Sequence, residues 1–396
     1  MAAQDAIEVF ERRRNGTGLH RAWQLREISS AVGPSDATAR ARDARRKICL
    51  QPGSIAVISG GDMSFLDGRI LVTGGAGFIG SALVWALNQR GHHDIVVTDL
   101  LGTDEKWKNL TPLKFADYVE ANVFREALRR DARAFGRFSV VFHLGACSAT
   151  TERNASYLVD NNYAYTKELA AWALAHDTRF IYASSAATYG DGAQGMDDKD
   201  ENLHRLRPLN MYGYSKHLFD LQAQRAGWLA QIVGVKYFNV FGPNEDHKGD
   251  MRSLVNKAYQ QILATGRVQL FRSHRPEYQD GEQQRDFLYV KDAVEMTLHF
   301  AEHPTGQTAA GLFNLGSGEA NTWLTLTRAI FAALGRSPQI DFIDMPEMLR
   351  GKYQYFTQAD VGKLRTSGYT RPMTALADAV RDYVQGYLVT GRRLGD

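Results

Sequence analysis

Short apolar runs alternate with longer amphipathic stretches along most of the chain after residue 69. Continuous apolar runs are typical of strands that are buried on both faces of a sheet, because such strands have no polar face. We expect strands at 70–73, 95–99, 140–144, 179–185 and 232–239, and helices around 163–175 and 211–226. Strands that alternate with helices predict an α/β fold with a doubly wound parallel sheet.

The alternation loosens after Asn239, where irregular loops predict a smaller C-terminal α/β lobe. Segments 287–293 and 312–315 are apolar again, and we expect both to return to the main sheet. A chain of 396 residues is long enough for two lobes. We therefore expect a nucleotide-binding domain at 70–238, with returning segments near 287–317, and a mainly substrate-binding lobe at 239–396.

Residues 1–69 differ from the rest, with clustered arginines and few periodic apolar positions. Their acidic residues do not fit a transit peptide, and no secretory apolar core is present. We expect an N-terminal extension that is not part of the fold. One hypothesis is that the native protein starts at Met63, because Gly60, Gly61 and Asp62 can be encoded by a ribosome-binding site. Mass spectrometry of the native N-terminus tests this, and a mature chain that begins well before Met63 would contradict it.

Charge is unevenly distributed between the extension and the body of the chain. The net charge is +3, but residues 1–50 hold 10 Lys and Arg against 6 Asp and Glu, which leaves −1 for residues 51–396. A nearly neutral body argues against a nucleic-acid partner, and no apolar run of about 18 residues predicts a membrane span. Cys49 and Cys147 form neither a disulfide framework nor a metal-ligand pattern. We expect a cytoplasmic protein without a bound metal.

The strand at 70–73 runs directly into Gly74, Gly77 and Gly80, and an apolar helix follows. Glycines at this spacing allow a tight turn, close approach of a pyrophosphate and close helix–strand packing. The helix N-terminus then presents free N–H groups to the phosphates. Asp99 ends the next strand 19 residues after Gly80, where its carboxylate can accept hydrogen bonds from ribose hydroxyls. Together these features predict a dinucleotide site on a Rossmann-type sheet.

A second chemical pattern joins Ser185, at the end of a predicted strand, to Tyr212 and Lys216 in a predicted helix. Tyr212 and Lys216 lie one helical turn apart on the same face. A phenol with a pKa of about 10 is a poor base at neutral pH. A neighbouring ammonium group, together with the positive ring of the bound dinucleotide, favours the phenolate and lowers that pKa, while Ser185 can hold a reacting hydroxyl or carbonyl. We expect the three residues to transfer protons beside the dinucleotide.

The chain resembles the extended short-chain dehydrogenase/reductase family from about Ile70 to Tyr387. Within this family it is most similar to the branch that acts on C6″ of ADP-linked heptoses. The motifs that carry this resemblance are His143–Ser148 with Thr150–Glu152, Asp160–Tyr163, Tyr182–Gly190, Tyr212–Lys216, Tyr237–Pro243, His247–Gly249, Arg285–Phe287 and Tyr353–Asp360.

The resemblance implies an isomerase that inverts C6″ of ADP-D-glycero-D-manno-heptose by transient oxidation and re-reduction on bound NADP. NAD stays open, because Asp99 favours an unphosphorylated ribose whereas Lys106 can neutralise a 2′-phosphate. By analogy Tyr212 serves one face of C6″ with Ser185 and Lys216. Lys248 serves the opposite face, to which the new hydroxyl points. The resemblance also implies a homopentamer that supplies heptose for the lipopolysaccharide inner core.

Binding roles follow from the same resemblance by position. For the cofactor it implies Gly74, Gly77, Phe78, Ile79, Gly80, Asp99, Leu100, Lys106, Leu144, Gly145, Ala146, Cys147, Ser148, Asn161, Lys216, Val240 and Lys248. For the ADP-sugar it implies Asn239, Asp250, Lys257, Phe271, Arg272, Ser273, His274, Arg285 and Tyr353. Arg285 suits bidentate contact with a pyrophosphate, although an ion pair with Asp286 is the simpler alternative.

Three other functions remain as alternatives. A nucleotide-sugar 4-epimerase of the UDP-hexose type would share the glycine loop, Ser185, Tyr212 and Lys216, but it turns the sugar over and does not need Lys248. A 4,6-dehydratase needs adjacent acids where this chain has Ala186 and Ala187. A non-catalytic NAD(P)-sensing protein would not need to keep the Tyr/Lys pair. The fold alone does not separate these functions.

Overall fold

The computed structural model describes residues 64–302, 309–351 and 353–396, which belong to one compact unit, Ser59–Asp396. Met63 and the extension before it lie outside the described residues. The described fold begins earlier than residue 70, because Ser64 caps a short 3₁₀ helix, Phe65–Asp67, whose Leu66 is buried in the core. The Ser64 hydroxyl also donates a 3.2 Å hydrogen bond to the carbonyl of Ala301. The last residues of the expected extension therefore pack against the fold.

The predicted fold class is confirmed: seven parallel strands form the main sheet in the order β10-β6-β5-β4-β1-β2-β3. Ligands bind outside the carboxyl ends of such strands where the strand order reverses. Here the order reverses between β1 and β4. The strands are β1 (Ile70–Thr73), β2 (Ile95–Asp99), β3 (Asp117–Glu120), β4 (Val140–His143), β5 (Arg179–Ser185), β6 (Val233–Tyr237) and β10 (Gly311–Leu315).

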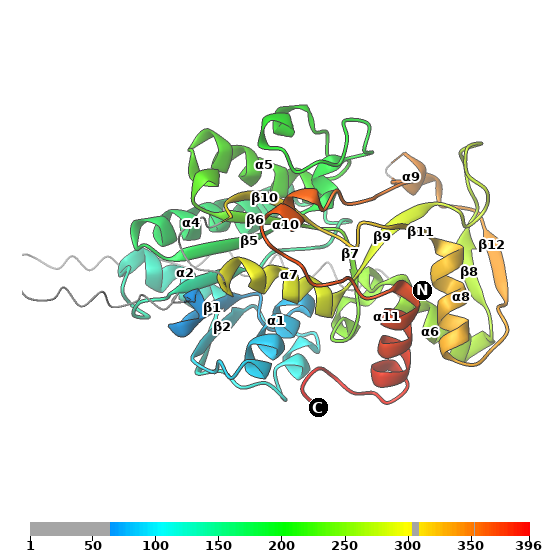
Figure 1. Ribbon diagram of the computed structural model, residues 1–396, viewed down its shortest axis with the longest axis horizontal. Coiled ribbons are helices and arrows are strands. Elements are labelled where there is room, and N and C mark those ends of the chain that lie inside the picture. The colour runs from blue at the N-terminus through cyan, green and yellow to red at the C-terminus, as the bar shows by residue number, and fades with distance from the viewer. Residues whose placement is uncertain (1–63, 303–308, 352) are drawn as a thin grey trace, which may run out of the picture. The chain divides into compact units, whose positions relative to one another are not determined.

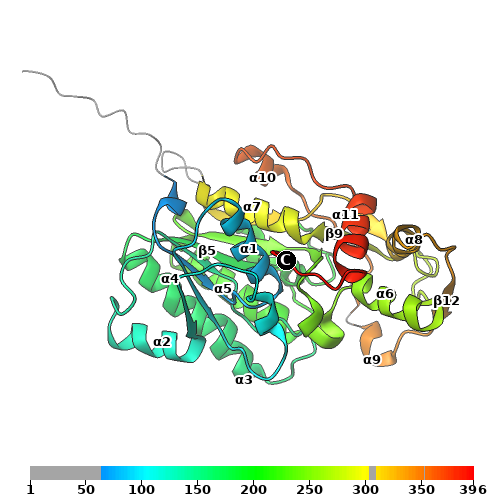
Figure 2. The same cartoon turned by 90° about the horizontal axis from the view of Figure 1, so that it is seen from below.

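Successive strand residues enter two separate cores, one on each face of the sheet. Ile70 and Val72 pack into the core that contains the helices α1 and α7, whereas Leu71 packs into the core that contains α2, α4 and α5. The views from two directions show these helices on opposite faces of the sheet (Figures 1 and 2). These helices and the short helix α3 have the bounds α1 (Phe78–Gln89), α2 (Ala121–Arg130), α3 (Ala155–Leu158), α4 (Tyr165–Ala175), α5 (Met211–Arg225) and α7 (Val290–Glu302).

Beyond Asn239 the chain builds two small sheets and a further set of helices, most of which lie at the right of Figure 1, whereas α10 lies beside β10 of the main sheet. One sheet has the order β11-β9-β7, and the other pairs β12 with β8. The strands are β7 (Asn239–Phe241), β8 (Val268–Phe271), β9 (Gln284–Tyr289), β11 (Ala320–Thr322) and β12 (Ile340–Ile343). The helices are α6 (Leu254–Thr265), α8 (Trp323–Ala333), α9 (Glu347–Arg350), α10 (Gly362–Thr366) and α11 (Leu376–Tyr383).

One sequence prediction about the main sheet was wrong. The segment 287–293 does not return to it, because β9 pairs with β7 and β11 instead, and the chain from Val290 onward forms α7. The return at 312–315 does occur, as β10 beside β6. The apolar run 232–239 is also divided, since β6 ends at Tyr237 and β7 begins at Asn239.

Short 3₁₀ and π helices carry several of the residues discussed below. They are η2 (Lys106–Asn109), the π-helix η3 (Val159–Ala164), η4 (Ala186–Tyr189), η5 (Asp200–Arg205), η6 (Trp228–Ala230), η7 (Asp246–Met251) and the π-helix η8 (Val384–Leu388).

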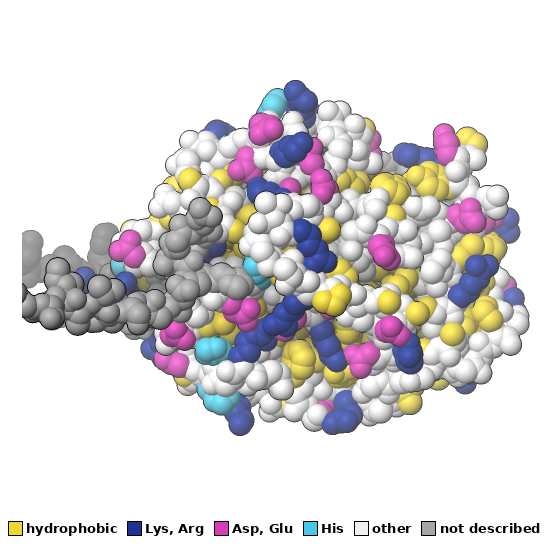
Figure 3. All heavy atoms as spheres, viewed as in Figure 1, with side chains coloured by type: hydrophobic (Ala, Val, Ile, Leu, Met, Phe, Trp, Pro, Cys, Tyr) yellow, Lys and Arg dark blue, Asp and Glu magenta, His cyan; other side chains and the backbone are white. Residues whose placement is uncertain are grey.

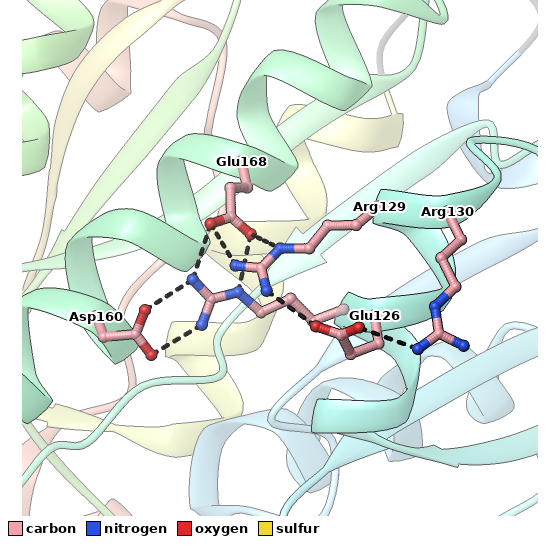
Figure 4. Close-up of polar contacts among 6 residues, drawn as sticks. Glu126, Arg129, Arg130, Asp160 and Glu168 are labelled. Carbon is pink, nitrogen blue, oxygen red and sulfur yellow. Dashed lines mark hydrogen bonds and ion pairs between the residues drawn. The ribbon is translucent and has the colours of Figure 1, made fainter. Parts of the chain in front are cut away.

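An ion-pair network fastens α2 to η3 and α4 (Figure 4). Arg125 donates two hydrogen bonds to Asp160, at 2.9 and 3.0 Å, and two to Glu168, at 2.8 and 2.9 Å. Arg129 donates to the same Glu168 carboxylate. The hydrogen bond from Arg125 is the main cause that lowers the pKa of Glu168 to about 2. The network therefore holds the π-helix that follows α3 against α2.

Acidic and basic side chains are interspersed across the face shown in Figure 3. In the described ranges, no helix combines the length and apolarity that crossing a membrane requires.

Candidate active site

The glycine loop is shaped by close backbone contacts between β1 and the start of α1. Gly74 has a φ of +69°, and a Cβ there would lie 2.6 Å from the backbone nitrogen of Gly145. At Gly80 a Cβ would lie 2.0 Å from the carbonyl oxygen of Gly74. Side chains at these two positions would collide with backbone atoms, so the turn requires glycine.

Asp99 organises both the glycine loop and the position after β2. One carboxylate oxygen accepts hydrogen bonds from the backbone nitrogens of Ala76 and Gly77, at 3.0 and 3.1 Å. The other accepts from the backbone nitrogen of Leu100 at 2.7 Å and from the ammonium of Lys106 at 3.2 Å. A cation is thus held beside the acid that we expected to meet the ribose.

A cleft of about 870 Å³ opens at the carboxyl ends of the main strands and extends to the second lobe. All four residues that we expected to be catalytic line it, namely Ser185, Tyr212, Lys216 and Lys248. The predicted binding residues that also line the cleft are Gly74, Gly77, Phe78, Ile79, Gly80, Asp99, Lys106, Leu144, Gly145, Ala146, Cys147, Ser148, Asn239, Val240, Lys257, Phe271 and Tyr353.

The structure does not bring Leu100, Asn161, Asp250, Arg272, Ser273, His274 or Arg285 into the lining of this cleft. Arg285 lies behind the wall, where its guanidinium stacks 4.9 Å from the ring centroid of Tyr353 and 5.7 Å from that of Trp323. Its Nη1 donates a 2.8 Å hydrogen bond to the carbonyl of Gln284. The carboxylate of Asp286 instead accepts hydrogen bonds from the backbone nitrogens of Ser317, Gly318 and Ala359. Arg285 therefore supports the aromatic wall.

Most of the other residues outside the lining contact nearby residues instead of the cleft. Arg272 is about half exposed and lies near Asp280 and Asp344, at 4.0 and 3.8 Å. Ser273 accepts a hydrogen bond from Arg275, and the backbone of His274 donates to the phenol of Tyr355. The amide of Asn161 donates to Asn162, and the carbonyl of Asp250 accepts from the ammonium of Lys257.

Tyr212, Lys216 and Ser185 meet because α5 begins beside the end of β5. Asn210 caps α5 by accepting from the backbone nitrogen of Gly213 at 2.8 Å, which places Tyr212 in the first turn. Burial raises the pKa of Tyr212, and a hydrogen bond with Ser185 opposes this effect. The lowering that we expect from Lys216 and the positive ring of a bound cofactor stays a prediction. Burial also lowers the pKa of Lys216 to about 8.

Lys248 reaches the same cleft from η7, in the second lobe. Its ammonium lies 5.1 Å from the ring centroid of Phe78, the first residue of α1. Burial lowers the pKa of Lys248, and the negative charge of Glu245 opposes this change. The buried Glu245 accepts two 2.6 Å hydrogen bonds from the backbone nitrogen and the hydroxyl of Ser253, which closes the loop around Lys248.

Tyr212 and Lys248, two titratable side chains that are able to transfer protons, reach one cleft from different lobes. The glycine loop lies at the end of the cleft where β1 meets α1. Such an arrangement can hold a dinucleotide against a polyhydroxy substrate.

Comparison with known proteins agrees with this geometry. The model of the NAD dependent epimerase/dehydratase family matches residues 70–316. The chain belongs to this family.

Two curated relatives match nearly their whole length. The ADP-L-glycero-D-manno-heptose-6-epimerase of Nitratidesulfovibrio vulgaris (strain Hildenborough) is 53% identical over 318 residues, which are 80% of this chain and 97% of the relative. The protein of the same name from Fusobacterium nucleatum is 44% identical over 328 residues, 81% of this chain and 98% of the relative. The crystal structure of Helicobacter pylori ADP-L-glycero-D-manno-heptose-6-epimerase matches with a TM-score of 0.66 and 27% identity, over 81% of this chain and 97% of that one.

Several residues that sequence reasoning did not select also belong to the site. The side chain of Asn162 hydrogen-bonds to both backbone polar groups of Cys147. Its Oδ1 accepts from the Cys147 nitrogen at 2.9 Å, and its Nδ2 donates to the Cys147 carbonyl at 3.0 Å. The same Nδ2 donates to the hydroxyl of Ser215 at 2.9 Å. The motif Asp160–Tyr163 was a signal for Asn162, although only Asn161 was chosen from it.

Other members of the wall carry no local signal. Trp323 and Gln269 line the cleft because α8 and β8 pack there, and the sequence around neither residue marks it as a binding site. Thr357 lies behind the wall, and its hydroxyl donates to the Oδ1 of Asn239 at 3.2 Å. Unlike Trp323 and Gln269, Thr357 lies within a motif, Tyr353–Asp360, but the motif assigns no role to Thr357.

Proposed function

We propose that this chain epimerises C6″ of ADP-D-glycero-D-manno-heptose and so produces the L-glycero epimer. The observation that carries the proposal is that Tyr212 and Lys248 line one cleft from different lobes. Inversion at an exocyclic carbon needs a proton-transfer group on each side of that carbon. The 53% identity to a curated protein that bears the name of this activity supports the same reaction.

The residues present fit a dinucleotide, because Gly74 and Gly77 line the cleft with backbone atoms and no side chain. At Gly77 a Cβ would lie 3.1 Å from the carbonyl oxygen of Gly74. When bound, the nicotinamide supplies a hydride acceptor and donor. NAD(P) dependence is a property of the family. We infer NADP in particular because Lys106 stands beside Asp99, where its ammonium can pair with a 2′-phosphate; NAD is the alternative.

The protein's own groups then have separate tasks. Ser185 orients the C6″ hydroxyl, and Tyr212 takes its proton while C6″ gives up its hydrogen as hydride. Lys216, whose ammonium is fixed on β5, favours the phenolate of Tyr212. The resulting ketone rotates about one exocyclic bond, and hydride returns to its other face. Lys248 then gives a proton to the oxygen, which now points away from Tyr212.

A UDP-hexose 4-epimerase activity is the competing function on the same scaffold. Such an enzyme uses one acid–base group on one side of a sugar that turns over. Lys248, which contacts Phe78 at the start of α1, has no task in that reaction. Its place in the cleft therefore favours C6″ chemistry.

The remaining expectations belong to the same proposal. We infer that residues 70–238 with the returning strand β10 hold the cofactor, and that the lobe at 239–396 holds the ADP-sugar. The family resemblance supports a cytoplasmic homopentamer that supplies lipopolysaccharide inner-core heptose.

The test is to incubate purified protein with ADP-D-glycero-D-manno-heptose, without added reductant, and to follow both C6″ epimers by proton NMR. We expect drift to an equilibrium mixture, loss of conversion in Tyr212→Phe, and a strong decrease in Lys248→Met. Folded, cofactor-loaded wild-type protein that leaves this substrate unchanged would refute the proposal. Conversion of a UDP-hexose instead would point to the competing function.

A further inference from the structure

Asn109 joins two loops that come from different lobes. It is the last residue of η2 and is buried, with 3% of its surface exposed. Its Nδ2 donates to the carbonyl of Ala76 at 3.0 Å and to the carbonyl of Asn244 at 3.1 Å. A side-chain amide nitrogen carries two hydrogens, so each carbonyl receives one of them. One side chain thus connects the glycine loop to the segment that leads to Lys248.

The two carbonyls are attached to the parts of the site that must act together. Ala76 lies inside the glycine loop, two residues before Phe78, and its backbone nitrogen donates to Asp99. Asn244 lies four residues before Lys248 in a left-handed conformation, with a φ of 76°. Its own side chain donates to the hydroxyl of Ser81 in α1 at 3.0 Å. The turn before Lys248 is therefore fixed to α1 and to the glycine loop.

His247 completes the connection on the side nearest Lys248. Its Nδ1 lies 3.4 Å from the Nδ2 of Asn109. Both hydrogens of that amide already go to the two carbonyls, so His247 packs against Asn109 without receiving a hydrogen of its own. The next residue, Lys248, places its ammonium 5.1 Å from the ring centroid of Phe78. The position of this ammonium against the cofactor-binding helix thus depends on a loop that Asn109 holds.

We propose that Asn109 is a positioning residue that couples the glycine loop to the loop of Lys248 and so controls the second proton transfer. This inference rests on the proposed function. It predicts that substitution of Asn109 slows inversion at C6″ more than oxidation of C6″. The reason is that Tyr212, Ser185 and Lys216 lie on α5 and β5 and receive no hydrogen bond from Asn109. Without the amide donors, oxidation of C6″ should continue while inversion fails.

The main variant is Asn109→Asp, which keeps the shape of the side chain and removes both donors. Asn109→Leu removes them without adding charge, and Asn109→Ser is a smaller change in case the first two fold poorly. Asn88→Asp is the matched control. The Nδ2 of Asn88 also donates to two backbone carbonyls, those of His92 at 3.0 Å and Lys114 at 2.8 Å, and Asn88 does not line the cleft.

Two rates are measured for each variant loaded with NADP and mixed with ADP-D-glycero-D-manno-heptose. Near-ultraviolet absorbance of reduced nicotinamide reports oxidation, and proton NMR reports inversion at C6″. Calorimetric titration with NADP and the melting temperature report cofactor affinity and folding. These last two readings separate a positioning effect from a loss of structure.

For the Asn109 variants we expect oxidation within about threefold of wild type and inversion slower by about ten- to a hundredfold, the scale that a small misplacement of a catalytic group produces. Asn88→Asp should leave the ratio of the two rates unchanged. A proportional decrease of both rates in every folded Asn109 variant, or unchanged inversion, would overturn the inference. If the wild-type protein does not invert C6″ at all, the proposed function itself is refuted. Failure of the proposed function is therefore distinguishable from failure of the inference about Asn109.

Discussion

The ammonium of Lys216 donates a 2.7 Å hydrogen bond to the carbonyl oxygen of Ala183, two residues before Ser185 on the same strand. This contact fixes α5, which carries Tyr212, to β5, which carries Ser185. It also keeps the charge of Lys216 away from bulk water. Burial accordingly lowers the pKa of Lys216 to about 8, and the negative charge of Asp220 opposes this change.

Activity should therefore fall as the pH rises through about 8. The pKa of Lys216 lies below its ordinary value, so Lys216 loses its proton, and its support of the Tyr212 phenolate, at a lower pH than an exposed lysine would. In Lys216→Arg the guanidinium stays charged, and the alkaline limit should move to higher pH even though overall activity decreases. The measurement is kcat/KM against pH, and an alkaline limit that does not move would assign it to another group.

Acid should weaken the fold through His143. This buried residue hydrogen-bonds to the hydroxyls of Thr73 and Thr166, and burial lowers its pKa to about 3. Below its ordinary pKa of about 6.5, the unfolded chain takes up a proton that the folded chain does not. Stability should therefore fall as the pH decreases towards about 3, by about 1.4 kcal/mol per pH unit from this residue.

Denaturant unfolding between about pH 6 and about pH 4 checks this prediction. The variant His143→Gln should show a smaller slope of unfolding free energy against pH than the wild type. Some slope should remain, because burial also lowers the pKa of His217 to about 4. The control is substitution of the exposed His204 by Gln, which should leave the slope as it is. Equal slopes in wild type and His143→Gln would contradict the prediction.

Gly80→Ala should destroy the cofactor site. The added Cβ would lie 2.0 Å from the carbonyl oxygen of Gly74, a backbone atom that cannot turn aside as a side chain can. We expect a cost above the about 1–3 kcal/mol that is typical of overpacking, with no measurable NADP binding in a calorimetric titration. At Gly351 no atom lies within 4 Å of an added Cβ, so Gly351→Ala should bind NADP like the wild type. Normal binding by Gly80→Ala would show that the loop moves more easily than we infer.

Lys236→Met should destabilise the fold strongly, because it leaves a buried charge without its partner. Lys236 and Asp220 form a 2.6 Å ion pair with both side chains fully buried, and Asp220 also accepts from the hydroxyls of Tyr182 and Ser184. Removal of one member of a buried pair costs about 3–5 kcal/mol. Thermal unfolding should show a large decrease in melting temperature.

The control for this prediction is the exposed ion pair between Arg267 and Asp341. Substitution of Asp341 by Asn should change the melting temperature only slightly, because water screens exposed pairs. A Lys236→Met variant as stable as the Asp341 variant would contradict the prediction.

The buried parallel strands could be predicted because their apolar runs are continuous. Ile70–Thr73 and Arg179–Ser185 have the predicted bounds. The edge strand Asp117–Glu120 could not be found in the same way, since it is partly exposed and has an acid at each end. The apolar run at 287–293 was assigned wrongly because it spans the end of β9 and the start of α7, and only tertiary pairing divides it.

The chemistry of the cleft was predictable where a motif is local, as with Tyr212 and Lys216 on one helix. The burial that raises the pKa of Tyr212 was not predictable, because it depends on elements far apart in the sequence. Arg285 illustrates the same limit: its motif gave no sign that its guanidinium lies against the rings of Trp323 and Tyr353, and its contact with a pyrophosphate stays a prediction. Asn109 carried no signal, because its two acceptors lie 33 and 135 residues away.

The position of β10 has a consequence for protein engineering. The chain leaves the main sheet after β6, returns as β10 beside it, and then leaves again. The second lobe is therefore built from two separate segments, one inserted between β6 and β10 and one that follows β10, rather than from one C-terminal module. A chimera that exchanges everything after Phe238 would also replace an edge strand of the cofactor domain. A transplant of sugar specificity should instead keep α7 (Val290–Glu302) and β10 (Gly311–Leu315) native, because both belong to the cofactor domain, and exchange the other segments after Phe238.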